Sequence, residues 1–531
     1  MANIVVRDLT FCHEGSVDAL FSHAGFTLDT DWKLGFVGRN GRGKTTFLRL
    51  LLGEFPYQGS IAAPVRFAYF PFDVPKEQSA WPALRVARAA IAPFDEWEAR
   101  MRETAPDAMD AYAEAYERYL AHDGFSIDEM IVKEAGKLGV RAEALGRPFG
   151  VLSPGERAKV MLAALFLRKN NFLLIDEPTD HLDAQGRALM ARYLAGKRGF
   201  ILVSHDRALL DGVVDHVLSI NRSTIEVQQG NFSVWWENKR RKDQHELEQD
   251  DQLRREIRRL SQTAREKSDW SSEVEKTKIG AHAGDRGFIG HKAAKMMRRA
   301  KAIEERSRRA VGEKAKLLQD IETADPVKLL PLVYHKERLI EVRDLSVAYG
   351  EKPVFEGLTF ELLRGERAAL TGSNGCGKSS VLKLLLGRDV PYSGEARAGG
   401  GLIISYAPQS AEGLAGPLGE YLAARALDET LVKSLLRKLD FSRAQFDLPL
   451  QRYSEGQKKK LLLAASLSMR AHLYIWDEPL NYIDVFSRVQ IEELLLRFEP
   501  TLLFVEHDAA FCDHVATKTI RLRHEQRHRS T

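Results

Sequence analysis

Short apolar runs alternate with helical patterns in the first and last parts of the chain. Residues 34–37 and 368–370 are apolar runs of strand length, and helical patterns follow them from Phe47 and from Val381. Strands that alternate with helices favour an α/β fold whose main sheet runs parallel. We therefore expect each of these two parts to form an α/β domain.

The middle of the chain, residues 231–337, has a different pattern. Proline is absent from residues 234–324, and charged helix formers dominate. Positions at steps of three and four within residues 253–264 and 296–317 are apolar except for Ser307 and Lys314, which weaken the second set; this spacing is typical of the seam between packed helices. The spacing predicts an antiparallel helical hairpin, and the glycine-containing residues 279–290 should form part of its tip.

This middle segment is basic, although the whole chain is nearly neutral. The chain carries a formal net charge of +4, whereas residues 238–320 hold 23 Lys or Arg against 15 Asp or Glu. A charge-rich helix is most often a solvated spacer, but a positive hairpin of this length also suits a polyanionic partner. We favour a functional arm over a spacer.

Four motifs occur twice, in the same order and at nearly the same spacing, which indicates a duplicated unit. They are a glycine-rich G-x-x-x-x-G-K-[ST] loop, a Ser-x-Gly motif, an Asp-Glu-Pro motif after an apolar run, and a His-Asp pair. Their copies lie at residues 38–45 and 372–379, 153–156 and 454–457, 176–178 and 477–479, and 205–206 and 507–508.

The glycine-rich loops predict phosphate binding. Glycines let backbone N–H groups converge on phosphate oxygens, and the following helix adds the positive end of its dipole. Lys44 and Lys378 would reach the terminal phosphates, and Thr45 and Ser379 would hold Mg²⁺. The expected loop residues are Gly38, Asn40, Gly41, Gly43, Lys44, Thr45 and Thr46, and then Gly372, Asn374, Gly375, Gly377, Lys378, Ser379 and Ser380.

The Asp-Glu-Pro motifs supply paired carboxylates at the ends of predicted strands. Asp176 and Asp477 suit a Mg²⁺ role. Glu177 and Glu478 are placed to orient the attacking water, because phosphoryl transfer depends on in-line geometry more than on covalent help. Adjacent carboxylates at such a place are costly unless a cation or substrate is bound, which favours a functional reading.

The other two motifs also suit phosphate chemistry. A lone histidine after an apolar run is more often a core or capping residue, but the repetition of His205 and His507 at similar spacing favours contact with the γ-phosphate. Ser153 and Ser454 each open a helix and can bind a phosphate presented from outside their own domain. The further residues expected in these two motifs are Gly155, Glu156, Gly456 and Gln457.

Composition narrows the cellular setting. The chain has 531 residues, enough for two or more domains, and only 3 separated cysteines, which argues against a disulfide framework or a zinc site. The N-terminus lacks a signal-peptide pattern, and no apolar run approaches the ~18 residues that span a bilayer. We expect a cytoplasmic protein with no membrane partner.

The two halves differ in length. The separation from Phe72 to Ser153 is longer than the corresponding separation from Gln409 to Ser454, and the excess falls at about residues 99–126. This segment is rich in Ala, Glu, Tyr and Met, which predicts a helical insertion. It is either a second contact arm or a decorated helical subdomain.

Together the motifs resemble the tandem ABC ATPase cassette. The absence of membrane spans and the basic linker resemble the ABC-F subgroup, which acts on ribosomes. Residues 38–45, 229–233 and 473–485 are similar to Lsa-type antibiotic-resistance proteins of that subgroup. The expected fold is α/β, with two tandem ABC-type nucleotide-binding domains joined by an antiparallel α-helical hairpin linker. The expected boundaries are residues 1–230, 231–337 and 338–531.

The resemblance implies two ATP molecules sandwiched head to tail, with hydrolysis to ADP and phosphate. Lys44 would share its ATP with the Ser454 motif, and Lys378 would share its ATP with the Ser153 motif. The ATP-closed protein, a monomer, would enter the exit site of the 70S ribosome and contact 23S rRNA, with P-site tRNA as a further candidate partner. The expected rRNA contacts are Lys276, Lys278, Arg286, Lys292, Lys295, Arg298 and Arg299.

Three residues depart from the family pattern. Phe72 stands where the first cassette should have a glutamine, while Gln409 fills that Mg²⁺-binding role in the second, so the first site is expected to hydrolyse ATP differently. Pro154 removes one backbone donor from the first signature. His13 stands where an adenine-stacking aromatic residue is usual, and Tyr349 is its counterpart.

The Lsa resemblance implies protection of the peptidyl-transferase centre from lincosamide, streptogramin A and pleuromutilin antibiotics. The alternative is a housekeeping or energy-sensing translation factor with no drug role. The basic hairpin argues against the energy subunit of a transporter. The lack of zinc cysteines and of far longer coiled coils argues against a chromosome-maintenance or DNA-repair ATPase.

Overall fold

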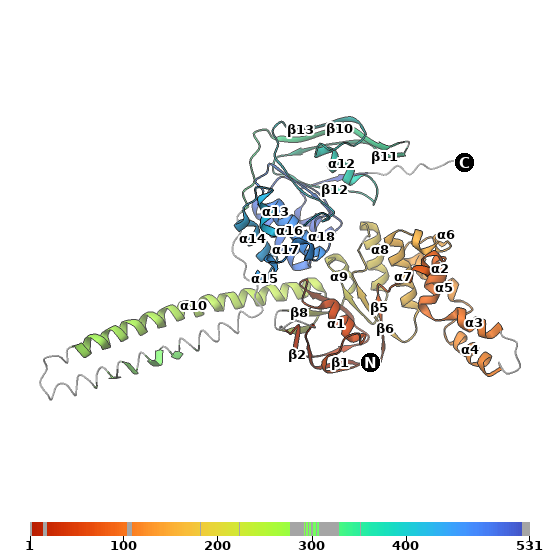
Figure 1. The fold of residues 1–531 in the computed structure, drawn as a ribbon, viewed down its shortest axis with the longest axis horizontal. Coiled ribbons are helices and arrows are strands. Elements are labelled where there is room, and N and C mark those ends of the chain that lie inside the picture. The colour runs from red at the N-terminus through yellow and green to blue at the C-terminus, as the bar shows by residue number, and fades with distance from the viewer. Residues whose placement is uncertain are drawn as a thin grey trace. The chain divides into compact units, whose positions relative to one another are not determined.

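The computed structural model divides the chain into two units (Figure 1). The first unit comprises Met1–Ile220, Ile225–Ser233 and Ala324–Thr531, and the second comprises Asn221–Thr224 and Val234–Thr323. The residues that the structure describes are 3–13, 19–102, 109–180, 182–221, 224–276, parts of 291–309, 329–350 and 352–522.

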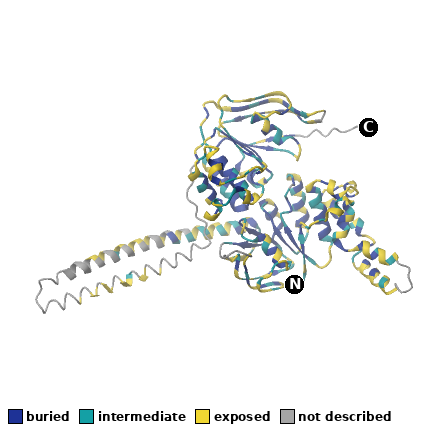
Figure 2. Ribbon diagram, in the orientation of Figure 1, coloured by how far each residue is buried: buried dark blue, intermediate teal, exposed yellow. Residues whose placement is uncertain are grey.

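The first half of unit 1 is built on a sheet of order β5-β6-β7-β3-β8-β9. Neighbouring strands pair in parallel except β8 and β9, which form an antiparallel pair. β6 and β7 are almost continuously apolar and buried, as expected of parallel strands covered on both faces (Figure 2). The bounds are β3 Lys33–Gly38, β5 Arg66–Phe70, β6 Asn171–Asp176, β7 Phe200–Val203, β8 His216–Ile220 and β9 Ile225–Gln229.

A second, antiparallel sheet of order β2-β1-β4 completes the strands of this half. Its strands are β1 Asn3–Phe11, β2 Phe21–Asp29 and β4 Gln58–Ala62. The helices are α1 Lys44–Leu51, α2 Ala83–Ile91, α3 Phe94–Arg102, α4 Met109–Ala121, α5 Ile127–Lys137, α6 Ala142–Leu145, α7 Pro154–Leu167, α8 Ala184–Ala195 and α9 Arg207–Val213. Short 3₁₀ turns lie at Lys76–Ala80 and Phe149–Val151.

The second half repeats this plan with a parallel sheet of order β14-β15-β16-β12-β17 and an antiparallel sheet of order β11-β10-β13. Its strands are β10 Arg338–Tyr349, β11 Lys352–Leu363, β12 Arg367–Thr371, β13 Tyr392–Ala398, β14 Ile404–Ala407, β15 Leu473–Asp477, β16 Leu502–Val505 and β17 Lys518–Arg521. Its helices are α12 Lys378–Leu385, α13 Leu418–Ala423, α14 Glu429–Lys438, α15 Arg443–Phe446, α16 Glu455–Ser468, α17 Val485–Phe498 and α18 Ala509–Val515, with a 3₁₀ turn at Leu450–Arg452.

The duplication extends to backbone irregularities. β1 bulges at Asp8 and β10 at Asp344, and both aspartates have a positive φ, 53° and 47°. Opposite each bulge a glycine packs on the strand backbone: a Cβ on Gly59 or on Gly394 would lie 2.4 or 2.2 Å from the carbonyl oxygen of that aspartate. Only glycine fits so close an approach. The expected α/β fold with two repeated domains is confirmed.

The inserted segment of the first half contains α3 and α4, which pack on each other. The side chains of Phe94 and Trp97 on α3 and Tyr119 on α4 are buried, and Phe94 contacts the other two edge-on. A helical insertion is expected at about residues 99–126; α4 lies within this range and α3 overlaps its start, while residues 103–108 are outside the described residues. The segment therefore has a small core of its own.

The helix α10, Phe232–Lys276, has 45 residues, and all but its first two belong to the second unit. At 1.5 Å per residue it is about 67 Å long. The described residues between 291 and 309 are also helical, whereas the expected tip at residues 279–290 and the rest of the second helix lie outside the described residues. The antiparallel hairpin therefore remains a prediction.

None of the described helices combines the length and the apolar composition that a membrane span requires.

Candidate functional site

Both glycine-rich loops connect a central parallel strand to a helix. Gly43 and Gly377 are the N-caps of α1 and α12, and both have a positive φ, 88° and 97°. A Cβ on Gly43 would lie 2.6 Å from Leu20 Cδ2, and one on Gly377 would lie 2.7 Å from Phe355 Cδ1. The sequence thus needs glycine here for conformation and for space, and the loop backbone is left free to wrap a phosphate.

The two lysines lie over their loops. Lys44 Nζ donates hydrogen bonds to the carbonyl oxygens of Gly38 at 2.7 Å and Arg39 at 3.2 Å. Lys378 Nζ does the same with Gly372 at 2.9 Å and Ser373 at 3.0 Å. Burial lowers the pKa of the Lys44 ammonium, against the opposing charges of nearby carboxylates. These ammonium groups stand where a phosphate in the loop would meet them.

The residues predicted to bind Mg²⁺ come together in both halves. Thr45 Oγ1 donates to Asp176 Oδ2 at 2.8 Å, and Ser379 Oγ donates to Asp477 Oδ1 at 3.3 Å. A hydroxyl and a carboxylate beside a phosphate loop are the hard oxygen ligands that Mg²⁺ prefers, so the donor set fits this ion. Sequence reasoning missed Tyr69, whose hydroxyl donates to the same Asp176 oxygen at 2.9 Å.

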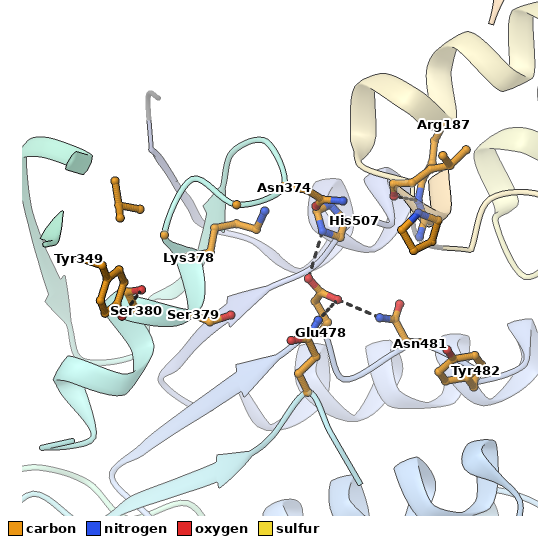
Figure 3. A pocket seen from close by; sticks show the side chains of 16 residues that line it. Arg187, Tyr349, Asn374, Lys378, Ser379, Ser380, Glu478, Asn481, Tyr482 and His507 are labelled. Carbon is orange, nitrogen blue, oxygen red and sulfur yellow. Dashed lines mark hydrogen bonds and ion pairs between the residues drawn. The ribbon is translucent and has the colours of Figure 1, made fainter. Parts of the chain in front are cut away.

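Glu478 is held by side chains from three segments (Figure 3). Its Oε1 lies 3.3 Å from His507 Nε2, and its Oε2 accepts hydrogen bonds from Gln409 Nε2 at 2.7 Å and Asn481 Nδ2 at 3.0 Å. Burial alone would raise the pKa of Glu478, but hydrogen bonds from His507 and Gln409 and the His507 charge outweigh it and hold this pKa at about 2. The carboxylate is therefore ionised and fixed.

Glu177 has fewer partners. Its Oε2 accepts the backbone N–H of His205 at 3.2 Å, and its Oε1 lies 3.4 Å from His205 Nε2. Burial, followed by the charges of Asp180 and Asp176, raises the pKa of Glu177 well above its ordinary value. Burial also lowers the pKa of His205 well below its ordinary value.

The strand registers identify which residues correspond between the two halves. Tyr69 pairs with Leu174 in β6, two residues before Asp176, and Tyr406 pairs with Ile475 in β15, two residues before Asp477. Phe72 and Gln409 each lie three residues beyond these tyrosines, so they occupy equivalent positions. Asp180 and Asn481 likewise each lie three residues after the glutamate. Comparing the two copies would have revealed the Asp180 and Asn481 difference, which the sequence reasoning overlooked.

Both glutamates have an unusual backbone. Glu177 and Glu478 have φ 47°, in the left-handed region that residues other than glycine rarely adopt. Their backbone N–H groups bond to the carbonyl oxygens of Val203 at 2.9 Å and Val505 at 3.0 Å, at the end of the next strand. Strained conformations of this kind cluster at functional sites, where they aim a side chain.

The Ser-x-Gly motifs start α7 and α16. Ser153 and Ser454 are N-caps in complete capping boxes with Glu156 and Gln457. Pro154 occupies the first position of α7, where an N–H has no helical partner in any case, so the helix itself tolerates it. Gly155 and Gly456 are buried in the first turns of these helices.

Two cavities adjoin the loops, and each combines residues of both halves. One, of about 650 Å³, is lined by Lys378, Ser379 and Glu478 of the second half and by Pro154 of the first. The other, of about 180 Å³, is lined by Asn40, Glu177 and His205 of the first half and by Glu455 and Gly456 of the second. Each phosphate loop thus faces the Ser-x-Gly motif of the other half.

The aromatic positions differ between the halves. Tyr349 is half exposed at the larger cavity, and its hydroxyl lies 3.0 Å from Ser380 Oγ. The His13 ring instead packs edge-on against Phe11 and Phe55, with centroids 5.0 and 6.2 Å away. A flat surface for an adenine is therefore offered by Tyr349.

The residues predicted to contact rRNA fall on the second unit. Lys276 is the last residue of α10, and Lys295 and Arg298 are helical and exposed. The remaining four, Lys278, Arg286, Lys292 and Arg299, lie outside the described residues.

The family model described as ABC transporter matches residues 21–180 and 355–481, which is more than half of the chain and includes both glycine-rich loops. The chain belongs to the ABC transporter family. It is an ATPase, with an ATP site in each half.

Relatives of known name match along most of their length. The chain is 29% identical to the "Probable ATP-binding protein YheS" of Escherichia coli over 93% of this chain and 74% of that protein. It is 27% identical to the "Energy-dependent translational throttle protein EttA" of Haemophilus influenzae, covering 91% and 86%, and to the "Ribosome protection protein VmlR" of Bacillus subtilis, covering 94% and 83%. The ABC-F resemblance is confirmed, while the Lsa type stays a prediction.

Solved structures support the tandem fold. An archaeal ribosome recycling factor, aABCE1, aligns with a TM-score of 0.56 at 19% identity, covering 98% of this chain and 88% of that one. The "RNase-L Inhibitor" gives the same values. At this identity the likeness concerns the fold alone.

We predict that Lys378→Ala weakens nucleotide binding at the second site by about 30-fold or more, because losing one partner of a buried charge pair costs at least about 2 kcal/mol. Lys383→Ala, on the exposed face of the same helix, is the matched control and should bind as the wild type does. Equilibrium dialysis with labelled ATP at a concentration near the wild-type Kd measures this. Two full-affinity sites in the Lys378 variant would refute the assignment.

Proposed function

We propose that this chain is an ATP-driven ribosome-binding factor of the ABC-F type. ATP binding closes the two halves and sets the position of the helical linker, and hydrolysis releases the ribosome. In this proposal the domains are residues 1–230, 231–337 and 338–531, the chain acts as a cytoplasmic monomer, and its partner is the 70S ribosome.

One observation carries this proposal. Relatives that are named for ribosome protection and for translational throttling match across more than nine-tenths of this chain, including the segment between the two ATPase halves. That segment is a long charged helix in a stretch with excess Lys and Arg. Such a surface suits RNA, whose phosphates dominate binding affinity and whose helices are recognised largely by shape.

The short helix α9 contacts both the second half of the chain and the start of α10. The backbone N–H and the hydroxyl of Ser233, in the first turn of α10, both bond to Asp211 of α9 at 2.6 Å. The same helix begins with Arg207, which forms a buried ion pair with Glu492 of the second half. Movement between the halves would therefore pull on α9 and, through Asp211, on the start of α10. In this proposal ATP shifts the equilibrium between an open and a closed arrangement of the two halves.

In the catalytic step, the residues of this chain position rather than react. Mg²⁺, held by Thr45 with Asp176 and by Ser379 with Asp477, would neutralise phosphate charge. Glu478, ionised and fixed by its three partners, orients a water in line with the γ-phosphate, and His507 holds that carboxylate in place. Lys378 and the N–H groups of its loop stabilise the phosphates.

A finer proposal is that the hairpin tip protects the peptidyl-transferase centre from lincosamide, streptogramin A and pleuromutilin antibiotics. The relative named for ribosome protection favours it. The relative named as a throttle favours the alternative, a housekeeping or energy-sensing factor with no drug role.

The double variant Glu177→Gln with Glu478→Gln should accumulate the closed form, because ATP binds and is not hydrolysed. We expect it to sediment with 70S ribosomes in ATP, at least about tenfold more than the wild type. Lys44→Ala with Lys378→Ala is the matched control that fails to close. If the glutamine variant stays in the free fraction while it still binds ATP, the proposal fails.

Expression in a susceptible host separates the two finer readings. If the chain protects the peptidyl-transferase centre, inhibitory concentrations of a lincosamide and a pleuromutilin should rise several-fold. The Lys44→Ala, Lys378→Ala variant at equal expression is the control and should give no rise. Unchanged concentrations with the active chain on ribosomes would favour the housekeeping role.

A further inference from the structure

We propose that the two ATP sites have different tasks: the second site, built on Lys378 and Glu478, hydrolyses ATP and opens, while the first site, built on Lys44 and Glu177, retains its nucleotide over many cycles and acts as the pivot. The inference rests on the ATPase activity and on contacts within unit 1, and it requires no ribosome.

The two glutamates differ in the hydrogen-bond donors around them. Gln409 and Asn481 each donate a hydrogen bond to Glu478. At the equivalent positions of the first half stand Phe72, which has no polar atom, and Asp180, a carboxylate without an N–H to give. Two of the three side chains that fix the catalytic carboxylate are therefore replaced. A carboxylate that is not held in line positions the water poorly, and small misplacements cost large factors in rate.

The first phosphate loop contacts the second half of the chain directly. Arg42 Nη2 lies 3.2 Å from Asp440 Oδ2, at the end of α14. The Arg39 guanidinium lies over the Phe486 ring of α17, 5.6 Å from its centroid. Asn40 Nδ2 donates to the carbonyl oxygen of Tyr482 at 2.8 Å. Three polar residues of this loop, Arg39, Asn40 and Arg42, thus reach across the interface.

The second loop lacks these cations. Cys376 and Ser373 occupy the positions of Arg42 and Arg39. Gly139, which has φ 77° at the end of α5, is the counterpart of Asp440, which has φ 68° at the end of α14. At the positions that correspond to Arg42 and Asp440 stand Cys376 and Gly139, which cannot form an ion pair.

The same asymmetry recurs beside the first site. Arg207, two residues after His205, forms a bidentate ion pair with Glu492 of α17, and less than a tenth of either side chain is exposed. The helix caps set the correspondence: Asp206 caps α9 as Asp508 caps α18, and Asp183 caps α8 as Asp484 caps α17. By this correspondence Ala509 occupies the position equivalent to Arg207, and Ala191 occupies the position equivalent to Glu492.

A buried pair of this kind resists separation, because pulling one partner away leaves a buried charge unpaired. The contacts of Arg39, Arg42 and Arg207 therefore fasten the first-site side of the interface by protein alone. At the corresponding positions on the second-site side, Ser373, Cys376 and Ala509 carry no charge that could do the same, so a bound nucleotide would bridge the halves there. The cavity there is larger, about 650 Å³ against about 180 Å³. We expect the two halves to separate first at the second site and to rotate about the first site.

Single glutamine variants test the division of labour. We expect Glu478→Gln to lower steady-state ATPase activity about 100-fold or more, and Glu177→Gln to lower it less than about threefold. In the Glu478→Gln background, Phe72→Gln with Asp180→Asn should raise the residual rate about tenfold, because it rebuilds the donor set at the first site. Asn481→Asp should lower kcat and leave KM unchanged. Equal losses from the two single variants, or a larger loss from Glu177→Gln, would overturn the proposal.

Nucleotide release tests the pivot without relying on turnover. The chain loaded with labelled ATPγS and passed over a desalting column should release one nucleotide quickly and one at least about tenfold more slowly. The slow phase should persist in Lys378→Ala and vanish in Lys44→Ala. Arg42→Cys with Arg207→Ala, which copies the second-half residues, should accelerate the slow phase.

Two further variants keep this test decisive. Arg49→Ala alters an arginine of α1 that pairs with Glu54 within its own half, and it should leave both release phases unchanged. Arg42→Cys alone serves if the double variant folds poorly. A single release phase in the wild type, or a slow phase insensitive to both arginine variants, would refute the pivot. Both results would leave ribosome binding untouched, so failure here is distinct from failure of the proposed function.

Discussion

The structure is organised around two partly buried acidic strand ends. Asp176 with Glu177, and Asp477 with Glu478, place adjacent carboxylates at the carboxyl edge of a parallel sheet, and the glutamates reach this place through a left-handed backbone. Ionised groups so close together are costly to bury unless opposite charge is supplied. The lysine of each loop supplies one part of that charge, and Mg²⁺ would supply another. Nucleotide binding and the conformation of the site are therefore coupled through electrostatics.

Each cavity is lined by residues of both halves. A nucleotide bound there would therefore contact both halves and join them. Part of the free energy of nucleotide binding would then go into bringing the two halves together. A protein contact that already joins the halves lowers the part that the nucleotide has to supply. Arg207 with Glu492 is such a contact, and it begins the same helix whose Asp211 holds Ser233 at the start of α10. Interface and linker are thus connected by one short helix.

The sequence predicted the fold and the duplication, because these depend on local patterns: glycines where φ is positive, apolar strands that end in carboxylates, and serines that cap helices. The roles of these residues toward phosphate stay predictions. The sequence did not predict the contacts of Arg39, Arg42 and Arg207. Their partners lie about 400 residues or more away for the first two and 285 for the third, and nothing in a local pattern links such positions. A position-by-position comparison of the two halves would have shown that Asn481 replaces Asp180 and would have drawn attention to it.

Covalent linkage explains why the two halves can differ at their interface. In a symmetric dimer of identical chains, every contact occurs twice, and a residue change on one face is imposed on both. Here the two copies lie in one chain, so an arginine and its partner glutamate can be present at one side while alanines stand at the symmetry-related positions. The differences are paired: Arg207 with Glu492 against Ala509 with Ala191, and Arg42 with Asp440 against Cys376 with Gly139. Paired differences avoid leaving an unpaired buried charge on either side, and they are what the proposed lasting joint at one ATP site and moving joint at the other would require.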